Sequence, residues 1–529
     1  MALKQVSLND DSFDLSIEEG LTLPNGTIVV NPTQIKMLTL LLKLRPEGIQ
    51  VTEDGGENDR YDLTEDGMSR LFADLFNEDL LWCPEKKSWF MYNGTIWEQD
   101  LSGALTLKRT HDFYAIMQLY IPCIDDPSTQ ENWGKYVYSR LSDTRYVERI
   151  LKKAKGYLTV PLPMLDADSE LINMPSYTLN LNTYKLQEHN PKDYLTKLTR
   201  CDLPTTNPDS LKNSPLKNHR EAYEAMKHEK WTQFIYQVME GDEEKSRYLQ
   251  KALGYSILGN PKEECMFILH GKTTRNGKST LLNTINHLMG DYSTVTSASI
   301  ICRAGVRKNA SQASPEIAGL KGKRFVSMSE SSKYGKLDED TIKILTGGEE
   351  IVCRGLYENI SSYVPQFVLW LSCNDLPDVE DKSLFASDRL RIIEFNKHFS
   401  RAEQNKNLKN EFQTEEQMYG IFWWLLEGLK MYRQEGLDLP DSMQKVVDRY
   451  ESNNDLVLTF LEDCCEQVDK ESVQARTLYS KYKSWAKASG YTPLTAQKFN
   501  AEMQIHKEWY SSYGKSNGYP TYKGMRIRI

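Results

Sequence analysis

Residues 265–280 read CMFILHGKTTRNGKST, an apolar run followed by a loop with two glycines that ends in Gly-Lys-Ser-Thr. The run 265–269 is typical of a buried strand. After the loop, apolar side chains in 281–289 repeat at helical spacing, and Gly290 is suited to end that helix. In this order of strand, glycine loop and helix, backbone N–H groups at the helix N-terminus can hold phosphates.

The loop is therefore a candidate nucleotide site. Lys278 would neutralise the β- and γ-phosphates, and the Ser279 hydroxyl would bind Mg²⁺. Gly271 and Gly277 have five residues between them, one more than in the usual motif, and the alternative is a structural turn. The predicted cofactors are ATP and Mg²⁺. The residues predicted to bind the nucleotide are Gly271, Thr274, Asn276, Gly277, Lys278, Ser279 and Thr280.

Two further apolar runs end in polar residues that suit ATP hydrolysis. The run 324–329 leads to Glu330, and the run 367–373 leads to Asn374. Both residues should reach one crevice, because the carboxyl ends of neighbouring parallel strands meet at the same edge of a sheet. There Glu330 would take a proton from water and join Ser279 on the metal, while Asn374 would orient the water. The alternatives are a solvated carboxylate at Glu330 and a plain turn at Asn374.

An arginine pair, Arg389 and Arg391, opens the strand-like run 388–395. An arginine inserted into the site of a neighbouring subunit would stabilise charge in the transition state of hydrolysis. We favour Arg389 over Arg391 for this role. The alternative is surface charge on a strand edge.

The net charge of −9 argues against a protein coated in nucleic-acid-binding charge, so any DNA contact must be local. The stretch 471–529 carries ten lysines and arginines against three glutamates. The nine cysteines show no C-x-x-C pair and are expected to be reduced thiols. No apolar run approaches the ~20 residues of a membrane span, and the first residues do not resemble a signal segment. We expect a cytoplasmic protein without membrane contact.

More motifs follow within about 120 residues of the loop: KILTGG at 343–348, RGLY at 354–357 and NDLP at 374–377. Together with the glycine loop, Glu330 and the Asp-Arg pair at 388–389, they resemble the superfamily 3 helicases. The likeness is greatest to the phage and plasmid primase-helicase group, which includes the poxvirus primase-helicase.

Flanking segments are similar to the same group. YDLTEDG at 61–67, with Trp89 and Trp97, looks like the domain that precedes the helicase, and 231–259 looks like its helical collar. Two departures are the pair Ser-Tyr at 176–177, where the group often has Asn-Gly, and a valine at 368 in place of a common lysine.

The resemblance implies an α/β fold: a P-loop NTPase core of the AAA+ kind with an α+β N-terminal domain, a helical collar and a C-terminal winged-helix domain. The expected divisions are an N-terminal arm at 1–55, the α+β domain at 56–205, a linker and collar at 206–260, the ATPase domain at 261–400, a helical connector at 401–454 and the winged-helix DNA-binding domain at 455–529.

Two regions are candidates for DNA contact. By the resemblance, 343–365 includes a hairpin that points into the channel of a ring, where Lys343, Arg354 and Tyr357 would contact phosphates or support the hairpin. The alternative, to which we give equal weight, is that Tyr357 packs against the hairpin and that Lys343 is merely solvated.

The second region is the basic C-terminal end. A helix predicted to start near 494–500 carries Gln497 and Lys498 close to its N-terminus, where they could enter a DNA groove. The alternative is a packing domain with a basic face.

The resemblance implies an ATP-dependent DNA helicase that acts in the replication of a phage or similar mobile element. It would work on single- and double-stranded DNA as a homo-oligomer, a hexameric ring, beside a separate primase or polymerase. The main alternative is an ATP-regulated origin-binding initiator without processive unwinding. A small-molecule kinase is less consistent with the sequence, since nothing looks like a lid over an acceptor substrate.

Overall fold

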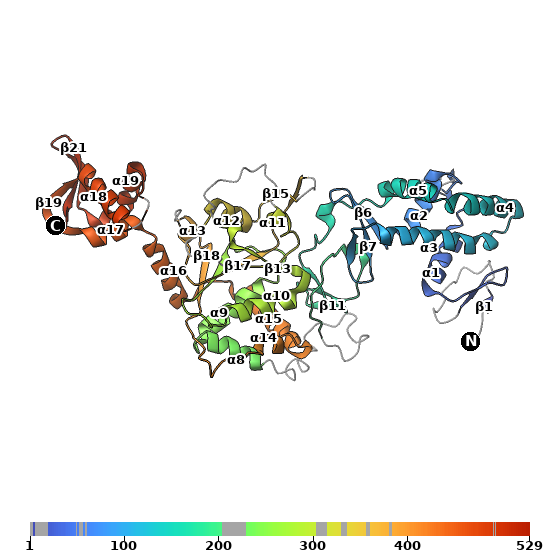
Figure 1. Ribbon diagram of the computed structural model, residues 1–529, viewed down its shortest axis with the longest axis horizontal. Coiled ribbons are helices and arrows are strands. Elements are labelled where there is room, and N and C mark those ends of the chain that lie inside the picture. The colour runs from blue at the N-terminus through green and yellow to red at the C-terminus, as the bar shows by residue number, and fades with distance from the viewer. Residues whose placement is uncertain are drawn as a thin grey trace.

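The computed structural model describes residues 4–5, 20–48, 50–51, 57–58, 61–203, 229–302, 315–329, 336–355, 360–379, 383–489, 491 and 493–528. These residues form three lobes in a row, with the two ends of the chain in the outer lobes (Figure 1). Glu330 and Tyr357, two of the predicted site residues, lie outside the described residues.

The N-terminal lobe is built mainly from helices around one apolar core. The helix α2 begins where Thr64 accepts a hydrogen bond from the N–H of Gly67, and its first turn is acidic, as the helix dipole favours. Leu21, Leu38 and Leu41 belong to the same core, so these parts of the expected arm at 1–55 are packed into the lobe. The helices are α1 (Pro32–Leu44), α2 (Glu65–Phe76), α3 (Ala104–Tyr120), α4 (Pro127–Tyr136) and α5 (Thr144–Tyr157).

Small sheets, mostly antiparallel, complete this lobe and its border with the central one. An Asn-Gly turn at 93–94 lies between two of their strands: β7 (Ser88–Tyr92) pairs with β8 (Trp97–Asp100), and β6 (Leu80–Cys83) pairs with β7. The other short strands are β1 (Lys4–Gln5), β2 (Leu21–Thr22), β3 (Ile28–Val29), β4 (Gln50–Val51), β5 (Glu57–Asn58), β9 (Leu171–Asn173), β10 (Thr178–Asn180) and β11 (Lys185–Gln187).

The central lobe holds a five-stranded sheet in the order β13-β14-β17-β12-β18, with every neighbouring pair parallel. The three strands expected around the glycine loop and the catalytic residues are confirmed as β12, β14 and β17, and the run after the arginine pair as β18. The strands are β12 (Met266–His270), β13 (Ser293–Ser297), β14 (Phe325–Ser329), β17 (Val368–Cys373) and β18 (Leu390–Glu394).

Helices cover this sheet. Two of them, α9 and α15, touch through glycines: a Cβ at Gly254 would lie 2.2 Å from the backbone N of Leu429, and one at Gly428 would lie 2.1 Å from the O of Gln250. The indole of Trp370 ties the sheet to this layer by donating to Ser256 Oγ at 3.0 Å. The helices are α8 (Glu229–Val238), α9 (Glu243–Tyr255), α10 (Lys278–Met289), α11 (Pro315–Ala318), α12 (Glu339–Thr346), α13 (Ser383–Ala386), α14 (Leu408–Glu411), α15 (Glu415–Glu435) and α16 (Asp441–Asn453).

The hairpin expected within 343–365 is present. Strand β15 (Ile351–Arg354) pairs antiparallel with β16 (Ile360–Tyr363), after α12 and a two-glycine turn. Two of its exposed side chains are apolar, Val352 at 69 % and Ile360 at 68 % exposure, and Arg354 is exposed beside them.

The C-terminal lobe has its own apolar core and follows α16 (Figure 1). A three-stranded antiparallel sheet in the order β19-β21-β20 packs beside three helices. The helix predicted to start near 494–500 is confirmed as α19. The elements are α17 (Leu456–Cys464), β19 (Cys465–Gln474), α18 (Ala475–Ala488), α19 (Ala496–Ile505), β20 (Ser512–Ser516) and β21 (Tyr519–Ile527). Among the described residues of all three lobes, none of the helices combines the length and apolarity that a membrane crossing requires.

Candidate functional site

The loop between β12 and α10 lies at the carboxyl edge of the parallel sheet. Gly277 precedes the helix with a φ of 91°, and a Cβ there would lie 2.6 Å from Val238 Cγ1. At Gly271 a Cβ would lie 2.5 Å from the backbone O of Phe395. Both positions therefore require glycine, one for its backbone angle and both for the close approach of neighbouring atoms.

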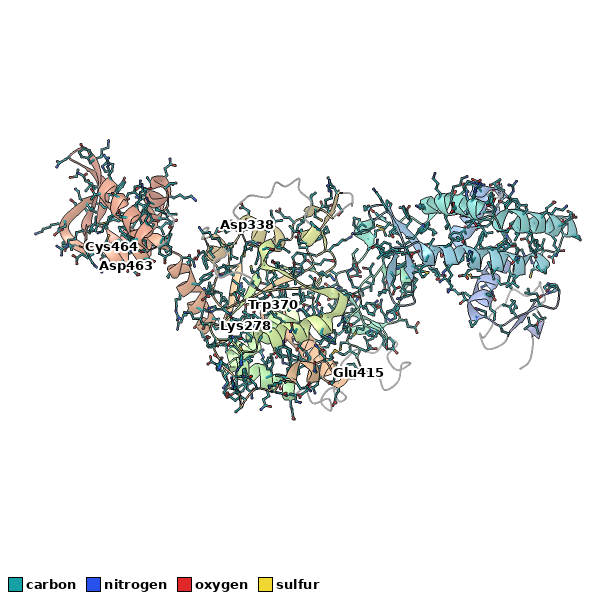
Figure 2. The ribbon with its side chains drawn as sticks, in the orientation of Figure 1. Lys278, Asp338, Trp370, Glu415, Asp463 and Cys464 are labelled. Atoms are coloured by element: carbon teal, nitrogen blue, oxygen red, sulfur yellow. The ribbon has the colours of Figure 1, made fainter. Side chains whose placement is uncertain are left out.

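Lys278 occupies the first turn of α10 and is 5 % exposed (Figure 2). Its Nζ donates to the backbone oxygens of Gly271 and Cys373, each at 2.8 Å, and to Asn374 Oδ1 at 3.0 Å. The ammonium group thus joins the start of the loop to the end of β17. The charge is thus fixed at the carboxyl edge of the sheet, directly at the start of the glycine loop.

Asn276 explains how the loop accommodates its additional residue. Its side-chain amide donates to the backbone O of Thr273 at 2.6 Å and more weakly to that of Gly271 at 3.4 Å. Arg275 takes a left-handed backbone conformation with a φ of 59°. From outside, His398 Nδ1 lies 2.8 Å from the O of Thr274. The longer loop is therefore held by hydrogen bonds within the loop and by a contact from the segment after β18.

Beneath the loop, His270 ends β12. Burial lowers the pKa of its imidazole, Glu394 opposes this shift, and the nearby Lys278 adds to it. The lowered pKa favours the neutral form of His270. Among the described residues at this edge of the sheet, Lys278 is then the buried cation.

The other predicted nucleotide and metal residues are accessible. Ser279 is exposed and Thr280 half-buried in the first turn of α10, and the side chain of Thr274 is exposed in the loop. Asn374 is exposed next to Lys278, directly after β17. The structure thus brings Asn374 to the glycine loop, as the strand order predicts. Glu330, which follows β14 in sequence, lies outside the described residues.

Arg389 lies at the opposite edge of the sheet from Lys278. Its backbone O accepts from the N–H of Met266, the first residue of β12, whereas the loop follows the last residue of that strand. Its guanidinium donates to Thr346 Oγ1 at 2.8 Å and forms an ion pair with Glu264. Arg391 is more deeply buried, within β18. Arg389 is therefore far from the loop of its own chain.

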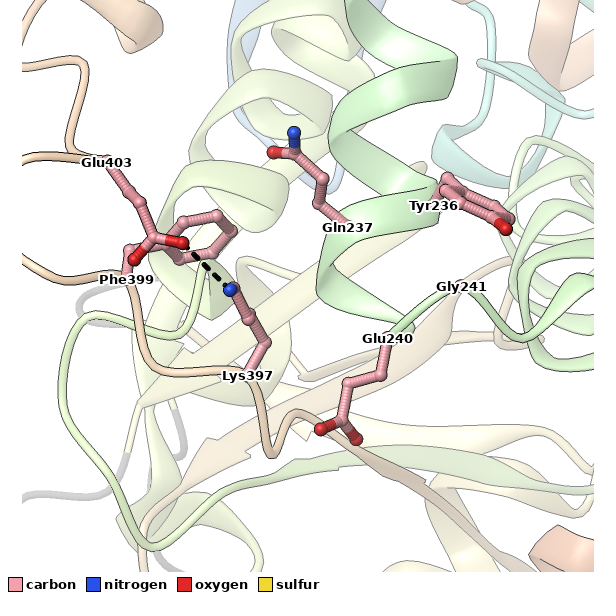
Figure 3. A pocket seen from close by; sticks show the side chains of 7 residues that line it. All are labelled: Tyr236, Gln237, Glu240, Gly241, Lys397, Phe399 and Glu403. Atoms are coloured by element: carbon pink, nitrogen blue, oxygen red, sulfur yellow. Dashed lines mark hydrogen bonds and ion pairs between the residues drawn. The ribbon is translucent and has the colours of Figure 1, made fainter.

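A cavity of about 720 Å³ opens beside the loop (Figure 3). Phe399 lines it, and its N–H donates to the O of Arg275 at 3.0 Å, so the cavity borders the glycine loop directly. An ion pair between Lys397 and Glu403 crosses one wall. The remaining lining residues are Tyr236, Gln237, Glu240 and Gly241.

The cavity residues and the two histidines around the loop, His270 and His398, were not predicted from the sequence. Tyr236 and Phe399 are far apart along the chain and belong to no motif. Their proximity depends on how α8 packs against the segment after β18. The one hint in the sequence was that residues 397–403 directly follow the strand-like run 388–395, which carries the arginine pair.

The predicted DNA-contacting residues fall in two separate places. Lys343 is half-buried on α12, which precedes the hairpin in sequence, and Arg354 is exposed at the end of β15 within the hairpin. Gln497 and Lys498 are both exposed in the first turn of α19, while Phe499 beside them is buried in the core of the C-terminal lobe. Tyr357 lies outside the described residues.

Two family models match the outer parts of the chain. The model described as "D5 N terminal like" matches residues 69–240, and the one described as "Poxvirus D5 protein-like" matches residues 452–524. These matches confirm the resemblance to the primase-helicase group that includes the poxvirus protein.

Viral proteins are among the relatives. A putative helicase of Acanthamoeba polyphaga mimivirus is 28 % identical over 268 residues, which cover 47 % of this chain and 28 % of the relative. A putative helicase of Invertebrate iridescent virus 3 is 21 % identical over 489 residues, covering 80 % of this chain and 50 % of the relative. The chain thus spans half or less of the length of these relatives.

A solved structure is more distantly similar. The apo structure of the NrS-1 C terminal region (305-718) covers 88 % of this chain and 99 % of that chain, with 11 % identity and a TM-score of 0.44. This likeness is too weak to support any inference about function.

Proposed function

We propose that this chain, whose outer parts match two families of D5-like proteins, is an ATP-dependent DNA helicase of superfamily 3 that acts in viral or mobile-element replication. The observation that supports this most strongly is the position of Lys278. It is buried at the carboxyl edge of a parallel sheet and joined to both the glycine loop and Asn374. That edge is where sheets of this class bind ligands.

In the proposed site, Lys278 exchanges a neutral oxygen for the β- and γ-phosphates, and backbone N–H groups of the loop hold the rest of the triphosphate. Ser279 and Glu330 are the proposed ligands of Mg²⁺, which neutralises phosphate charge when bound. Glu330 accepts a proton from the attacking water, and Asn374 fixes the direction of that water. The cavity lined by Tyr236 and Phe399 has the position and the aromatic walls to take the base.

The position of Arg389, at the edge of the sheet opposite the loop, is consistent with a ring of subunits. Arg389 cannot serve the loop of its own chain, because β12 separates the two by about 16 Å of strand. We propose that it enters the site of a neighbouring subunit in a hexameric ring. The hairpin of β15 and β16 would then line the channel, with Arg354 and Lys343 near single-stranded DNA.

The C-terminal lobe is proposed to be a winged-helix domain for duplex DNA. Its order of helix, strand, two helices and two strands is that of such domains, and α19 presents Gln497 and Lys498 to solvent. From the resemblance we also propose domain limits at 205, 260, 400 and 454; a limit at 55 is not proposed, because Leu38 and Leu41 pack in the core of the N-terminal lobe.

The test combines three measurements on the purified chain. Single-stranded DNA should stimulate ATP hydrolysis, a labelled strand should be displaced from a fork, and electron microscopy with ATP and DNA should show closed rings. Stimulated hydrolysis without strand displacement would favour the origin-binding initiator. Hydrolysis that no DNA affects would contradict both functions.

A further inference from the structure

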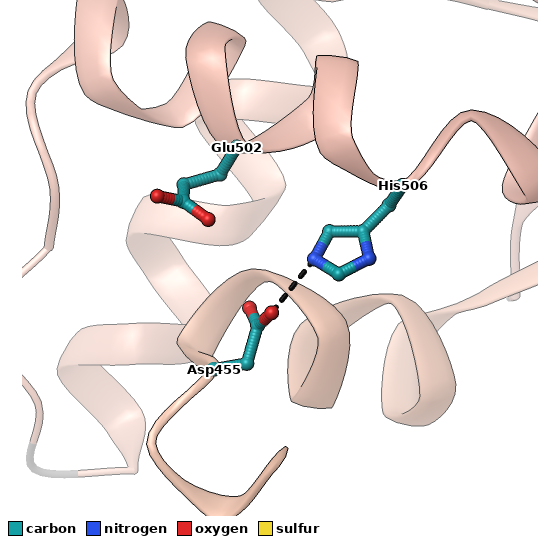
Figure 4. A group of neighbouring side chains, drawn as sticks. All are labelled: Asp455, Glu502 and His506. Atoms are coloured by element: carbon teal, nitrogen blue, oxygen red, sulfur yellow. Dashed lines mark hydrogen bonds and ion pairs between the residues drawn. The ribbon is translucent and has the colours of Figure 1, made fainter. Parts of the chain in front are cut away.

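Three metal-ligating side chains meet in the C-terminal lobe, away from the nucleotide loop: Asp455, Glu502 and His506 (Figure 4). One ligand atom of each, a carboxylate oxygen or an imidazole nitrogen, lies within 4.8 Å of the other two. Asp455 directly precedes α17, whereas Glu502 and His506 are four residues apart at the end of α19. A four-residue spacing places both side chains on one face of a helix.

The cluster is buried enough to need charge compensation. Asp455 is 5 % and His506 7 % exposed, and Glu502 is half-buried. Carboxylates taken out of water are costly unless a cation or hydrogen-bond donors accompany them.

The carboxylate of Asp455 is fixed in direction. Its Oδ1 caps α17 by accepting the N–H groups of Val457 and Leu458 at 3.1 and 2.9 Å. This leaves Oδ2 facing His506 Nε2 at 2.7 Å. The capping bonds thus hold one carboxylate oxygen in the position that a shared cation needs.

The imidazole of His506 is fixed from its other side. Its Nδ1 lies 3.2 Å from Glu508 Oε1. Histidines that bind metals commonly donate one ring N–H to a carboxylate in this way and use the second nitrogen as ligand. If Nδ1 carries the proton, Nε2 and Asp455 Oδ2 are both acceptors, so a second proton or a metal ion must join them.

We propose that Asp455, Glu502 and His506 bind one divalent first-row transition ion of the Zn²⁺ class, with water completing the coordination. One imidazole with two carboxylates suits such ions, whereas Mg²⁺ and Ca²⁺ prefer oxygen ligands alone. A metal ion would bind Glu502 as well as Asp455 and His506, whereas a second proton on the ring would join only His506 and Asp455. The ion would link Asp455, which precedes α17, to the end of α19. It would thereby stabilise the helix that carries Gln497 and Lys498.

The test uses the full-length chain, stripped of metal by a chelator and kept free of nucleotide. Zn²⁺ should bind with a stoichiometry of one for this site and raise the midpoint of thermal unfolding of the C-terminal lobe, whereas Mg²⁺ should not. Glu502→Gln should weaken Zn²⁺ binding at least about tenfold. Its metal-free unfolding midpoint should stay unchanged, because the contact between His506 and Asp455 is intact. The control is Glu462→Gln, an exposed carboxylate on α17.

Two results would overturn the site. Equal Zn²⁺ affinity in the wild type and Glu502→Gln would reduce the cluster to a protonated, hydrogen-bonded pair. Co²⁺ serves as a second probe: a thiolate-to-cobalt charge-transfer band that Glu502→Gln leaves unaltered would place the ion on cysteines instead. Because Glu502→Gln keeps the hydrogen bond between His506 and Asp455, this variant should fold even where His506→Gln does not.

Discussion

Lys278 of the central lobe and Lys498 of the C-terminal lobe occupy the same kind of position, the first turn of a helix. A cation there opposes the helix dipole in both cases. Lys278 is buried against three oxygens, whereas Lys498 is exposed and contributes only its backbone N–H to the cap at Thr495. A buried lysine suits one compact anion that enters a closed cradle. An exposed lysine suits an extended row of phosphates.

The largest expected effect on activity is that of replacing the buried lysine, Lys278. Lys278→Ala should reduce ATP hydrolysis to background, because it removes the charge that would face the phosphates and one donor to the oxygens of Gly271 and Cys373. Circular dichroism and a phosphate-release assay measure folding and activity together. The matched control is Lys262→Ala, an exposed lysine of the same lobe that should retain full activity. DNA-dependent hydrolysis in folded Lys278→Ala protein would contradict the assignment.

Much of this buried site could be predicted because its residues are close in sequence and follow one rule. Strand, glycine loop and helix adjoin along the chain, and parallel strands bring Asn374 to the loop. The cavity lined by Tyr236 and Phe399 could not be predicted, since it depends on how α8 packs against a segment about 160 residues away.

The helices of the N-terminal lobe between 104 and 157 also escaped prediction. In α3, apolar residues are spread around the helix, so no single face signals its burial. The strand β13 was missed because its sequence is STVTS, with one apolar residue. Its pairing with β14, more than its own side chains, determines its place at the edge of the sheet.

A second effect concerns the edge of the sheet opposite Lys278. Arg389→Ala should slow hydrolysis about 10³-fold, as expected for loss of an arginine that acts in trans. Mixing this variant with Lys278→Ala should restore activity, because about one quarter of interfaces in a random one-to-one ring would pair an intact loop with an intact arginine.

The mixing experiment needs proof that both variants form rings and exchange subunits. Activity that remains at background at every ratio would argue against Arg389 acting across the interface. The same titration with Arg391→Ala tests the second arginine of the pair. Since Arg391 is buried within β18, its variant is expected to lose stability without complementing Lys278→Ala.

The third effect separates binding from chemistry within the buried site. Glu330→Gln should bind ATP with nearly unchanged affinity and hydrolyse it at least ~100-fold more slowly, because the amide cannot accept a proton from water. A fluorescent nucleotide measures affinity, and single-turnover phosphate release measures the chemical step. Loss of nucleotide affinity along with activity would show that Glu330 has a structural role instead.

The smallest effect belongs to the exposed lysine. Lys498→Ala should weaken binding to duplex DNA modestly and lower the slope of log affinity against log salt by about 1, as the loss of one phosphate contact predicts. ATP hydrolysis should be unchanged, because Lys498 lies in a lobe with a separate core. Lys487→Ala is the charge-matched control, since it removes an exposed lysine from the far end of α18. Any loss common to both variants reports the net charge of the lobe, and only the excess in Lys498→Ala reports a contact at α19. Deletion of 455–529 sets the lower limit of duplex affinity. An identical salt slope in Lys498→Ala, Lys487→Ala and the wild type would remove α19 from the DNA interface and leave its basic face to solvent.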